Sequence, residues 1–265
     1  MGLEKSRKSN KFKSPNMKIA LIGYGKMGKA VEKLALAKGH EVVLRIDQNN
    51  KAALSQENLK SADVAIEFSI PATAVQNISV CLENHLPVVS GTTGWLEQMP
   101  AVKELCQQHH GAFFYASNFS IGVNILFAVN RTLANFMKRH QQYDVSIEEI
   151  HHTQKLDYPS GTALTLAEGI LENTALKKAW SAHLASDQAP VMEEKDNDSL
   201  KIISKRISDV PGTHFVKWAS PIDQLEISHV AHSREGFAMG ALSAAEWIIG
   251  KKGVFGMNDL LGFPS

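Results

Sequence analysis

Strand-like and helical patterns alternate over residues 18–117, and this alternation limits the fold more than any other feature of the chain. Continuous apolar runs, typical of parallel strands buried on both faces, occupy residues 18–23, 41–47, 63–69, 87–94 and 111–117. Helical spacing of apolar residues is found at residues 26–38, 71–84 and 98–109. Strands that alternate with helices form a parallel sheet with helices on both faces. We therefore expect an α/β fold, with a doubly wound, Rossmann-like domain over residues 17–118.

The alternation ends after Asn118, and the rest of the chain predicts a different architecture. Helical patterns occupy residues 124–140 and 162–176, strand patterns occupy residues 143–152, 200–208, 213–220 and 224–231, and a polar, charged connector occupies residues 177–199. This order predicts a second, α+β domain over residues 119–240, with a mixed or antiparallel sheet. A helix over residues 236–250 follows, and we expect residues 241–265 to pack back on the first domain.

Composition narrows the class of protein. The 28 lysines and arginines balance 27 acidic residues, so no overall field draws the chain to nucleic acid or to a membrane. No apolar run reaches the roughly 18 to 20 residues of a membrane span. Cys81 and Cys106 lie far apart and fit reduced thiols, so we expect a cytoplasmic protein.

Residues 1–16 are basic and have no apolar face, so we expect a disordered tail. A nucleic-acid contact, a targeting segment or an extension are the alternatives for this segment.

The stretch GYGKMG, residues 23–28, joins the first strand to the first helix. Gly23 ends the strand, Gly25 lets a pyrophosphate approach the backbone, and Gly28 lets the helix lie close to the sheet. An ordinary packing turn is the alternative interpretation. The next strand, however, ends at Asp47, whose carboxylate can accept hydrogen bonds from a ribose. The combination favours a dinucleotide site.

Side chains near this turn bear on which nicotinamide cofactor is used. Asp47 fits the free ribose of NAD, whereas Arg45 and Lys26 can pair with the additional phosphate of NADP, so we expect both cofactors to be used. The loops at residues 91–94 and 116–124 follow strands of the same predicted sheet. Ligands bind at this edge of doubly wound sheets, so these loops are candidates to line the nicotinamide.

A second constellation lies in EIHHTQKLDYPSGTAL, residues 149–164. His151, His152 and Lys155 precede a helix whose first free N–H groups, from residue 161 onward, form an anion site. An imidazole, an ammonium and a helix start suit a substrate that carries carboxylates, with a proton donor beside it. One surface histidine, one core histidine and a solvated lysine are the simpler alternative. Zinc is disfavoured because HExxH and paired cysteines are missing, so we expect no metal.

Several motifs resemble those of the 4-hydroxy-tetrahydrodipicolinate reductases, also called dihydrodipicolinate reductases. The resemblance runs from Met17 to about Gly250 and is carried by IALIGYGKMGK, EFSIPAT, SGTTGW, SNFSIGVN, HHTQKLDYPSGTAL and ISHVAHSREGFAMGAL. It implies an enzyme that reduces 4-hydroxy-tetrahydrodipicolinate, by way of dihydrodipicolinate, to tetrahydrodipicolinate in the diaminopimelate route to lysine. It further implies NADPH or NADH as the cofactor, a small dicarboxylate as the substrate, and a homotetramer joined through the second domain.

The resemblance also assigns roles to residues. It implies that His151 and Lys155 are catalytic. The implied substrate-binding residues are His152, Ser160, Gly161, Thr162 and Arg234. The implied cofactor-binding residues are Gly23, Tyr24, Gly25, Lys26, Met27, Gly28, Arg45, Asp47, Phe68, Gly91, Thr92, Thr93, Ala116, Ser117, Asn118 and Phe119.

The chain departs from the family pattern in three places. Many members have a longer glycine turn ending in Gly-Arg-Met-Gly, where this chain has Lys26 in the arginine position. Thr213 stands where the family commonly has a glutamate, and the connector at residues 177–199 is shorter and unlike most. Two alternative functions remain: another two-domain NAD(P)-dependent dehydrogenase, of the amino-acid or homoserine type, and a dinucleotide-sensing binding protein without enzymatic activity.

Overall fold

The computed structural model describes residues 16–185, 198–233 and 235–263, and it divides into two compact units. The first unit contains the chain up to Phe113 together with Ala245–Gly253, and the second contains Phe114–Ala244 together with the residues from Val254 onward. Among the described residues, no helix has both the length and the apolar character needed to span a membrane.

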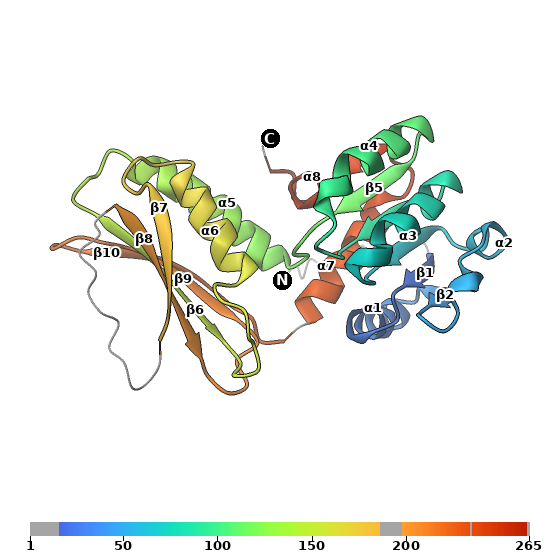
Figure 1. Ribbon diagram of the computed structural model, residues 1–265, viewed down its shortest axis with the longest axis horizontal. Helices are drawn as coiled ribbons and strands as arrows, with labels where there is room; N and C mark the ends of the chain where they lie inside the picture. Colours follow the sequence, from blue (N-terminus) through green and yellow to red (C-terminus); the bar gives the residue numbers. More distant parts are fainter. Residues whose placement is uncertain (1–15, 186–197, 234, 264–265) are drawn as a thin grey trace, which may run out of the picture. The chain divides into compact units, whose positions relative to one another are not determined.

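A six-stranded sheet lies mainly in the first unit, and the last residues of two of its strands are counted with the second (Figure 1). Its strands, in the order in which they lie side by side, are β11 (Gly253–Phe255), β5 (Ala112–Tyr115), β4 (Val88–Ser90), β3 (Val64–Glu67), β1 (Lys18–Ile22) and β2 (Glu41–Ile46). The strand β1 runs parallel to β2 on one side and to β3 on the other, and β3 runs parallel to β4. The chain passes from β1 to β2 on one side, crosses back to β3 on the other side of β1, and then continues outward to β4. This reversal of direction is typical of a doubly wound sheet.

Helices connect these strands. They are α1 (Lys26–Ala37), α2 (Gln56–Leu59), α3 (Pro71–Glu83) and α4 (Met99–Gln108), with 3-10 turns η1 (Lys51–Ala53) and η2 (Leu96–Gln98). Because crossover connections between parallel strands are right-handed, α1 lies on one face and α3 and α4 lie on the other. Strands such as β1 and β3 are buried along almost their whole length, as continuous apolar runs predict. The predicted α/β fold class is confirmed.

The second unit is built on a five-stranded sheet with one face covered by two helices (Figure 1). The strands lie in the order β10 (Gln224–Val230), β9 (Thr213–Ala219), β6 (Asp144–His151), β8 (Ser199–Arg206) and β7 (Ala179–Leu184). The strand β6 pairs in parallel with β8 and antiparallel with β9, so the sheet is mixed, as predicted. The helices are α5 (Ile121–Met137) and α6 (Gly161–Leu171). The remaining helices are α7 (Glu235–Ile248) and α8 (Met257–Leu261).

Alternation along β6 decides which side chains face the two helices. Val145 and Ile147 are buried in a core with Leu166 and Trp218. Successive residues of a strand point to opposite faces, so every second residue continues the core-facing row. Two and four positions beyond Ile147 this row contains a glutamate and a histidine, and both are buried. The apolar core therefore gives way to a buried polar cluster at the end of β6.

Two expectations about the second half need correction. Residues 177–199 were predicted as a connector, but β7 occupies part of that range and pairs in parallel with β8. It is an edge strand with exposed and half-exposed side chains, so its sequence lacks an apolar run. The long helix starts at Ile121 rather than at residue 124, because the Ser120 hydroxyl accepts a hydrogen bond from the Val123 N–H and caps the helix.

Candidate active site

The glycine turn has the geometry that close backbone approach requires. Gly23 has φ 93°, and a Cβ atom there would lie 2.0 Å from the Phe68 carbonyl oxygen. A Cβ atom on Gly28 would lie 2.4 Å from the Gly23 carbonyl oxygen. Gly25 differs, because a Cβ atom there would meet nothing within 4 Å. Gly23 and Gly28 are therefore required by packing, whereas Gly25 leaves open space at the start of α1.

That open space belongs to a pocket of about 470 Å³ at the carboxyl ends of β1, β3 and β4. Its lining residues are Gly25, Lys26, Met27, Phe68, Ser69, Pro71, Gly91, Thr92 and Thr93. Seven of them were predicted to bind the cofactor, and Ser69 and Pro71 were not. Gly25 precedes α1 without a side-chain cap, so the first N–H groups of the helix are available to an anion. The turn and pocket fit a dinucleotide pyrophosphate.

Glu67, at the end of β3, organises two loops of this pocket. Its fully buried carboxylate accepts hydrogen bonds from the Ser90 hydroxyl at 2.6 Å, the Thr92 hydroxyl at 2.9 Å and the Ser69 N–H at 2.9 Å. The loops after β3 and β4 are thereby joined through one side chain. Sequence reasoning missed Glu67, although an acid that ends the apolar run VAIE was a usable signal.

Arg45 and Asp47, two of the three residues predicted to select the cofactor, both have partners within the protein. Arg45 Nε donates to Glu32 Oε1 at 2.8 Å, and the Tyr24 hydroxyl also donates to Glu32. These two hydrogen bonds, led by that from Arg45, lower the pKa of Glu32. The Asp47 carboxylate accepts from the Asn49 N–H at 2.7 Å and fixes the turn after β2. Any phosphate that binds Arg45 must compete with Glu32.

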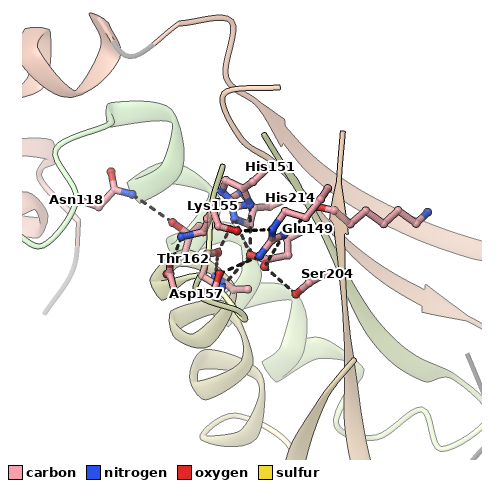
Figure 2. A network of polar contacts seen from close by, with 12 residues as sticks. Asn118, Glu149, His151, Lys155, Asp157, Thr162, Ser204 and His214 are labelled. Carbon is pink, nitrogen blue, oxygen red and sulfur yellow. Dashed lines mark hydrogen bonds and ion pairs between the residues drawn. The ribbon is translucent and has the colours of Figure 1, made fainter. Parts of the chain in front are cut away.

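Strand register assembles the polar cluster of the second unit around Glu149. Glu149 lies opposite Ser204 of β8 on one side and His214 of β9 on the other. Its Oε1 accepts from the Ser204 hydroxyl at 2.7 Å, and its Oε2 accepts from the Ser160 N–H at 3.0 Å. Figure 2 shows Glu149 at the centre of these contacts. Burial opposes its charge, but the hydrogen bonds from Ser160 and Ser204 outweigh burial and hold its pKa below the usual range.

His151 and His214 lie on either side of Oε2 of Glu149. The distance from that oxygen to His151 Nδ1 is 3.6 Å, and to His214 Nε2 it is 3.8 Å. Burial lowers the pKa of both histidines, to about 3 for His214. For His151, the Glu149 charge opposes this effect, whereas Lys155 and Arg206 reinforce it. Both rings are therefore neutral at neutral pH in the unliganded protein.

Lys155 lies in the loop between β6 and α6, and Arg206 of β8 holds that loop. The Lys155 ammonium lies 2.6 Å from Asp157 Oδ2, and its side chain is 18% exposed. Arg206 donates through Nε to the Lys155 carbonyl at 3.0 Å and through Nη2 to the Asp157 carbonyl at 2.9 Å. The ammonium is therefore mostly shielded beside Asp157, and Arg206 fixes the backbone of the loop. Sequence reasoning missed both of these residues.

The start of α6 is arranged as an anion site. The Ser160 hydroxyl caps the helix by accepting from the Ala163 N–H at 3.2 Å, and it also lies 3.1 Å from His214 Nε2. Both the N–H and the hydroxyl of Ser160 therefore already have hydrogen-bond partners within the protein. Gly161 has open space around its Cα, and Thr162 Oγ1 accepts from Asn118 Nδ2 at 3.3 Å (Figure 2). His152, partly buried, follows β6 directly.

Some predicted residues fall elsewhere. Ala116, Ser117, Asn118 and Phe119 belong to the loop before α5, in the second unit, whereas the pocket belongs to the first. Arg234 lies outside the described residues, as does nearly all of the predicted tail.

Among the residues that the structure describes, one group could hold a metal ion, with one atom each of Glu149, His151 and His214 within 4.8 Å of one another. Ser160 already bonds to two of these three side chains, so hydrogen bonding accounts for the cluster.

Two family models cover nearly the whole chain between residues 17 and 261. The model described as "Dihydrodipicolinate reductase, N-terminus" matches residues 17–119. The model described as "Dihydrodipicolinate reductase, C-terminus" matches residues 122–261. The chain belongs to the dihydrodipicolinate reductase family. The predicted resemblance is confirmed, as is the expectation of an NAD(P)H-dependent oxidoreductase.

Curated relatives of this reductase family support the same assignment. A 4-hydroxy-tetrahydrodipicolinate reductase from Christiangramia forsetii is 46% identical over 247 residues, which are 92% of this chain and 98% of the relative. A protein with the same name from Methanoregula boonei is 35% identical over 204 residues, which are 77% of this chain and 76% of the relative.

Solved structures share the fold. The dipicolinate-bound dihydrodipicolinate reductase from Paenisporosarcina sp. TG-14 matches with a TM-score of 0.71 and 22% identity, over 92% of this chain and 99% of that one. An amine dehydrogenase from Mycobacterium smegmatis matches with a TM-score of 0.54 and 12% identity, over 90% and 94%. Enzymes with different substrates therefore share this architecture, so the fold alone does not determine the reaction.

Proposed function

We propose that the protein reduces 4-hydroxy-tetrahydrodipicolinate, after loss of water to dihydrodipicolinate, to tetrahydrodipicolinate, with NADH or NADPH. The observation that carries this proposal is a site in the second unit whose groups suit a bound anion. There, Lys155, His151 and the open start of α6 lie in one short stretch of chain and around one buried acid. The names of the relatives at 46% and 35% identity support the same substrate.

The residues of the anion site divide into those that bind and those that handle the proton. We assign the two substrate carboxylates to Gly161, Thr162 and His152, because the N–H groups of a helix start favour anions. Arg234 was predicted with them and stays a prediction. Ser160 acts differently: it caps α6 and fixes the direction of those N–H groups.

We assign proton delivery to His151 and electrostatic stabilisation to Lys155. A nicotinamide, when bound, would supply a hydride to the conjugated ring, and the ring carbon left electron-rich would then need a proton. Burial keeps His151 neutral in the unliganded protein, but two substrate carboxylates nearby raise the pKa of an imidazole and favour its protonated form. The Lys155 ammonium offsets the negative charge that develops on the ring.

Cofactor choice follows from the first unit. The open space at Gly25 and the start of α1 would hold the pyrophosphate, and Asp47 would bind the adenosine ribose. Lys26 lines the pocket, but Arg45 is paired with Glu32, so the phosphate of NADPH must displace a carboxylate from it. We therefore propose that both cofactors are used, with NADH preferred.

We also propose that the protein forms a homotetramer through the second unit. Light scattering, which measures molar mass, tests the number of subunits.

A coupled assay tests the reaction, because the unstable substrate can be formed in situ while the loss of NADH or NADPH is followed. Oxidation of neither cofactor would refute the proposed function. His151→Gln and Lys155→Ala are each expected to reduce kcat on the order of 100-fold or more, because they remove the proton donor and a stabilising charge. Cofactor binding, followed by nucleotide fluorescence, should be retained in both variants. Turnover with homoserine or an amino acid instead would favour the alternative dehydrogenase.

A further inference from the structure

Glu149 is a buried acid of the second unit that the proposed mechanism does not use. It is completely buried, and it belongs to the core-facing row of β6, two residues before His151. Charged side chains are rarely buried without hydrogen bonds or opposite charges to compensate them. Because Glu149 lies beside His151, the proposed proton donor, its charge can influence the protonation of that imidazole.

The two oxygens of Glu149 join three elements. Oε2 binds the Ser160 N–H at 3.0 Å and so holds the residue that caps α6, the helix proposed to bind substrate. The same oxygen faces His151 Nδ1 at 3.6 Å. Oε1 is anchored by the Ser204 hydroxyl of β8 at 2.7 Å. Ser204 thereby fixes the carboxylate, which accepts a hydrogen bond at the start of α6 and also faces the imidazole of His151.

The other charges around His151 act against its protonation. Lys155 comes from the loop after β6, Arg206 from β8, His214 from β9, and His152 is the next residue in the chain. Positive charge on any of these groups disfavours a second positive charge on His151. Glu149 is the acid in this set, and its negative charge opposes them.

We propose that Glu149 is a positioning residue: it aligns His151 with the start of α6 and stabilises the imidazole in its protonated form. The inference rests on the proposed function, because it assigns Glu149 a role in that reaction. It predicts a proton on Nδ1, the ring nitrogen that faces Glu149. A carboxylate partner fixes the tautomer and orientation of a histidine in this way at many enzyme sites.

The first experiment compares Glu149→Gln with Glu148→Gln. The control removes a neighbouring acid by the same substitution, but Glu148 points to the opposite face of β6 and pairs with Lys205. We expect Glu149→Gln to lower kcat on the order of 10-fold to 100-fold, which is typical when a supporting partner is lost. Its alkaline loss of activity should move to lower pH, because the protonated imidazole loses its counter-charge. KM for NADH should stay within about twofold, since the cofactor pocket belongs to the other unit, and Glu149→Asp should recover part of kcat.

The second experiment does not depend on turnover. Nitrogen-15 NMR of labelled histidines, with the His151 signal assigned by its loss in His151→Gln, reports the tautomer and the titration midpoint. We expect Nδ1 protonation in the wild type and a lower midpoint in Glu149→Gln. If Glu149→Gln does not fold, Ser204→Ala, which removes one anchor of the carboxylate, should give a smaller shift in the same direction.

The outcomes separate the two proposals. A wild-type protein that oxidises neither cofactor refutes the proposed function, whatever the NMR shows. An active wild type whose Glu149→Gln or Ser204→Ala variant keeps the pH profile and the His151 midpoint overturns the role of Glu149 alone. Equal losses of kcat in Glu149→Gln and Glu148→Gln would also overturn it, because the effect would then be one of general charge.

Discussion

Replacing His214 should change how the stability of the second unit depends on pH. His214 is 5% exposed, and its Nε2 lies 3.1 Å from the Ser160 hydroxyl. That hydroxyl accepts from the Ala163 N–H, so its own proton is free to be donated to a neutral imidazole. Protonation would remove this acceptor and place a positive charge in a buried site, where desolvation outweighs the attraction of Glu149. We therefore expect His214→Gln, which keeps an acceptor oxygen but cannot be protonated, to remove an acid-sensitive element.

The size of the effect follows from linkage. Burial lowers the pKa of His214 from 6.5 to about 3 in the folded protein. Between these values the unfolded chain binds a proton that the folded chain does not, so the free energy of unfolding falls as the pH falls from 6.5 toward 3. At about 1.4 kcal/mol per pH unit, the full contribution is about 5 kcal/mol, and about 3 kcal/mol of it is lost by pH 4.5.

Guanidinium unfolding at several pH values between 4.5 and 7.5 measures this difference. Fluorescence of Trp218, which is buried in the core of the same unit, reports on the relevant transition. At pH 7 the variant should be equal to the wild type or less stable by about 1 kcal/mol, because the hydrogen bond to Ser160 is weakened. At pH 4.5 the order should reverse. Parallel curves of stability against pH for the two proteins would refute the linkage argument.

Four further predictions concern the glycine turn and the residues near it. Gly23→Ala should destabilise the first unit by more than about 3 kcal/mol, because its Cβ atom would lie 2.0 Å from the Phe68 carbonyl oxygen at a positive φ. Gly25→Ala should leave thermal stability almost unchanged but weaken NADH binding at least about tenfold, since its Cβ enters only open space; normal affinity would move the pyrophosphate elsewhere. Glu32→Gln should release Arg45 and raise kcat/KM for NADPH relative to NADH several-fold. Lys26→Ala should lower NADPH use more than NADH use, and equal losses would show that Lys26 does not contact the extra phosphate.

The sequence predicts best what is local. The strands of the first unit are continuous apolar runs, and the glycine turn, Lys155 and Gly161 can all be read from short contiguous stretches. Glu149, Ser204 and His214 could not be grouped in this way. They come from three strands, and only the register of β6 with β8 and β9 brings them together.

Other omissions have similar physical causes. Glu32 meets Tyr24 and Arg45 because α1 packs against β2, the strand that contains Arg45, and no sequence period indicates this contact. The strand β7 was missed because an edge strand exposed to solvent has no apolar row. One signal was present but not used: Glu149 occupies the apolar phase of an alternating strand, where an unpaired acid would be costly.

The buried carboxylate of Glu67 has a consequence for how the pocket meets its ligand. The loops after β3 and β4 both depend on that one side chain, through Ser69, Ser90 and Thr92. Their backbones are ordered by the fold itself, so a ligand that enters the pocket does not have to immobilise them. The conformational entropy of these loops is lost when the chain folds, and the interactions made on binding can contribute fully to affinity.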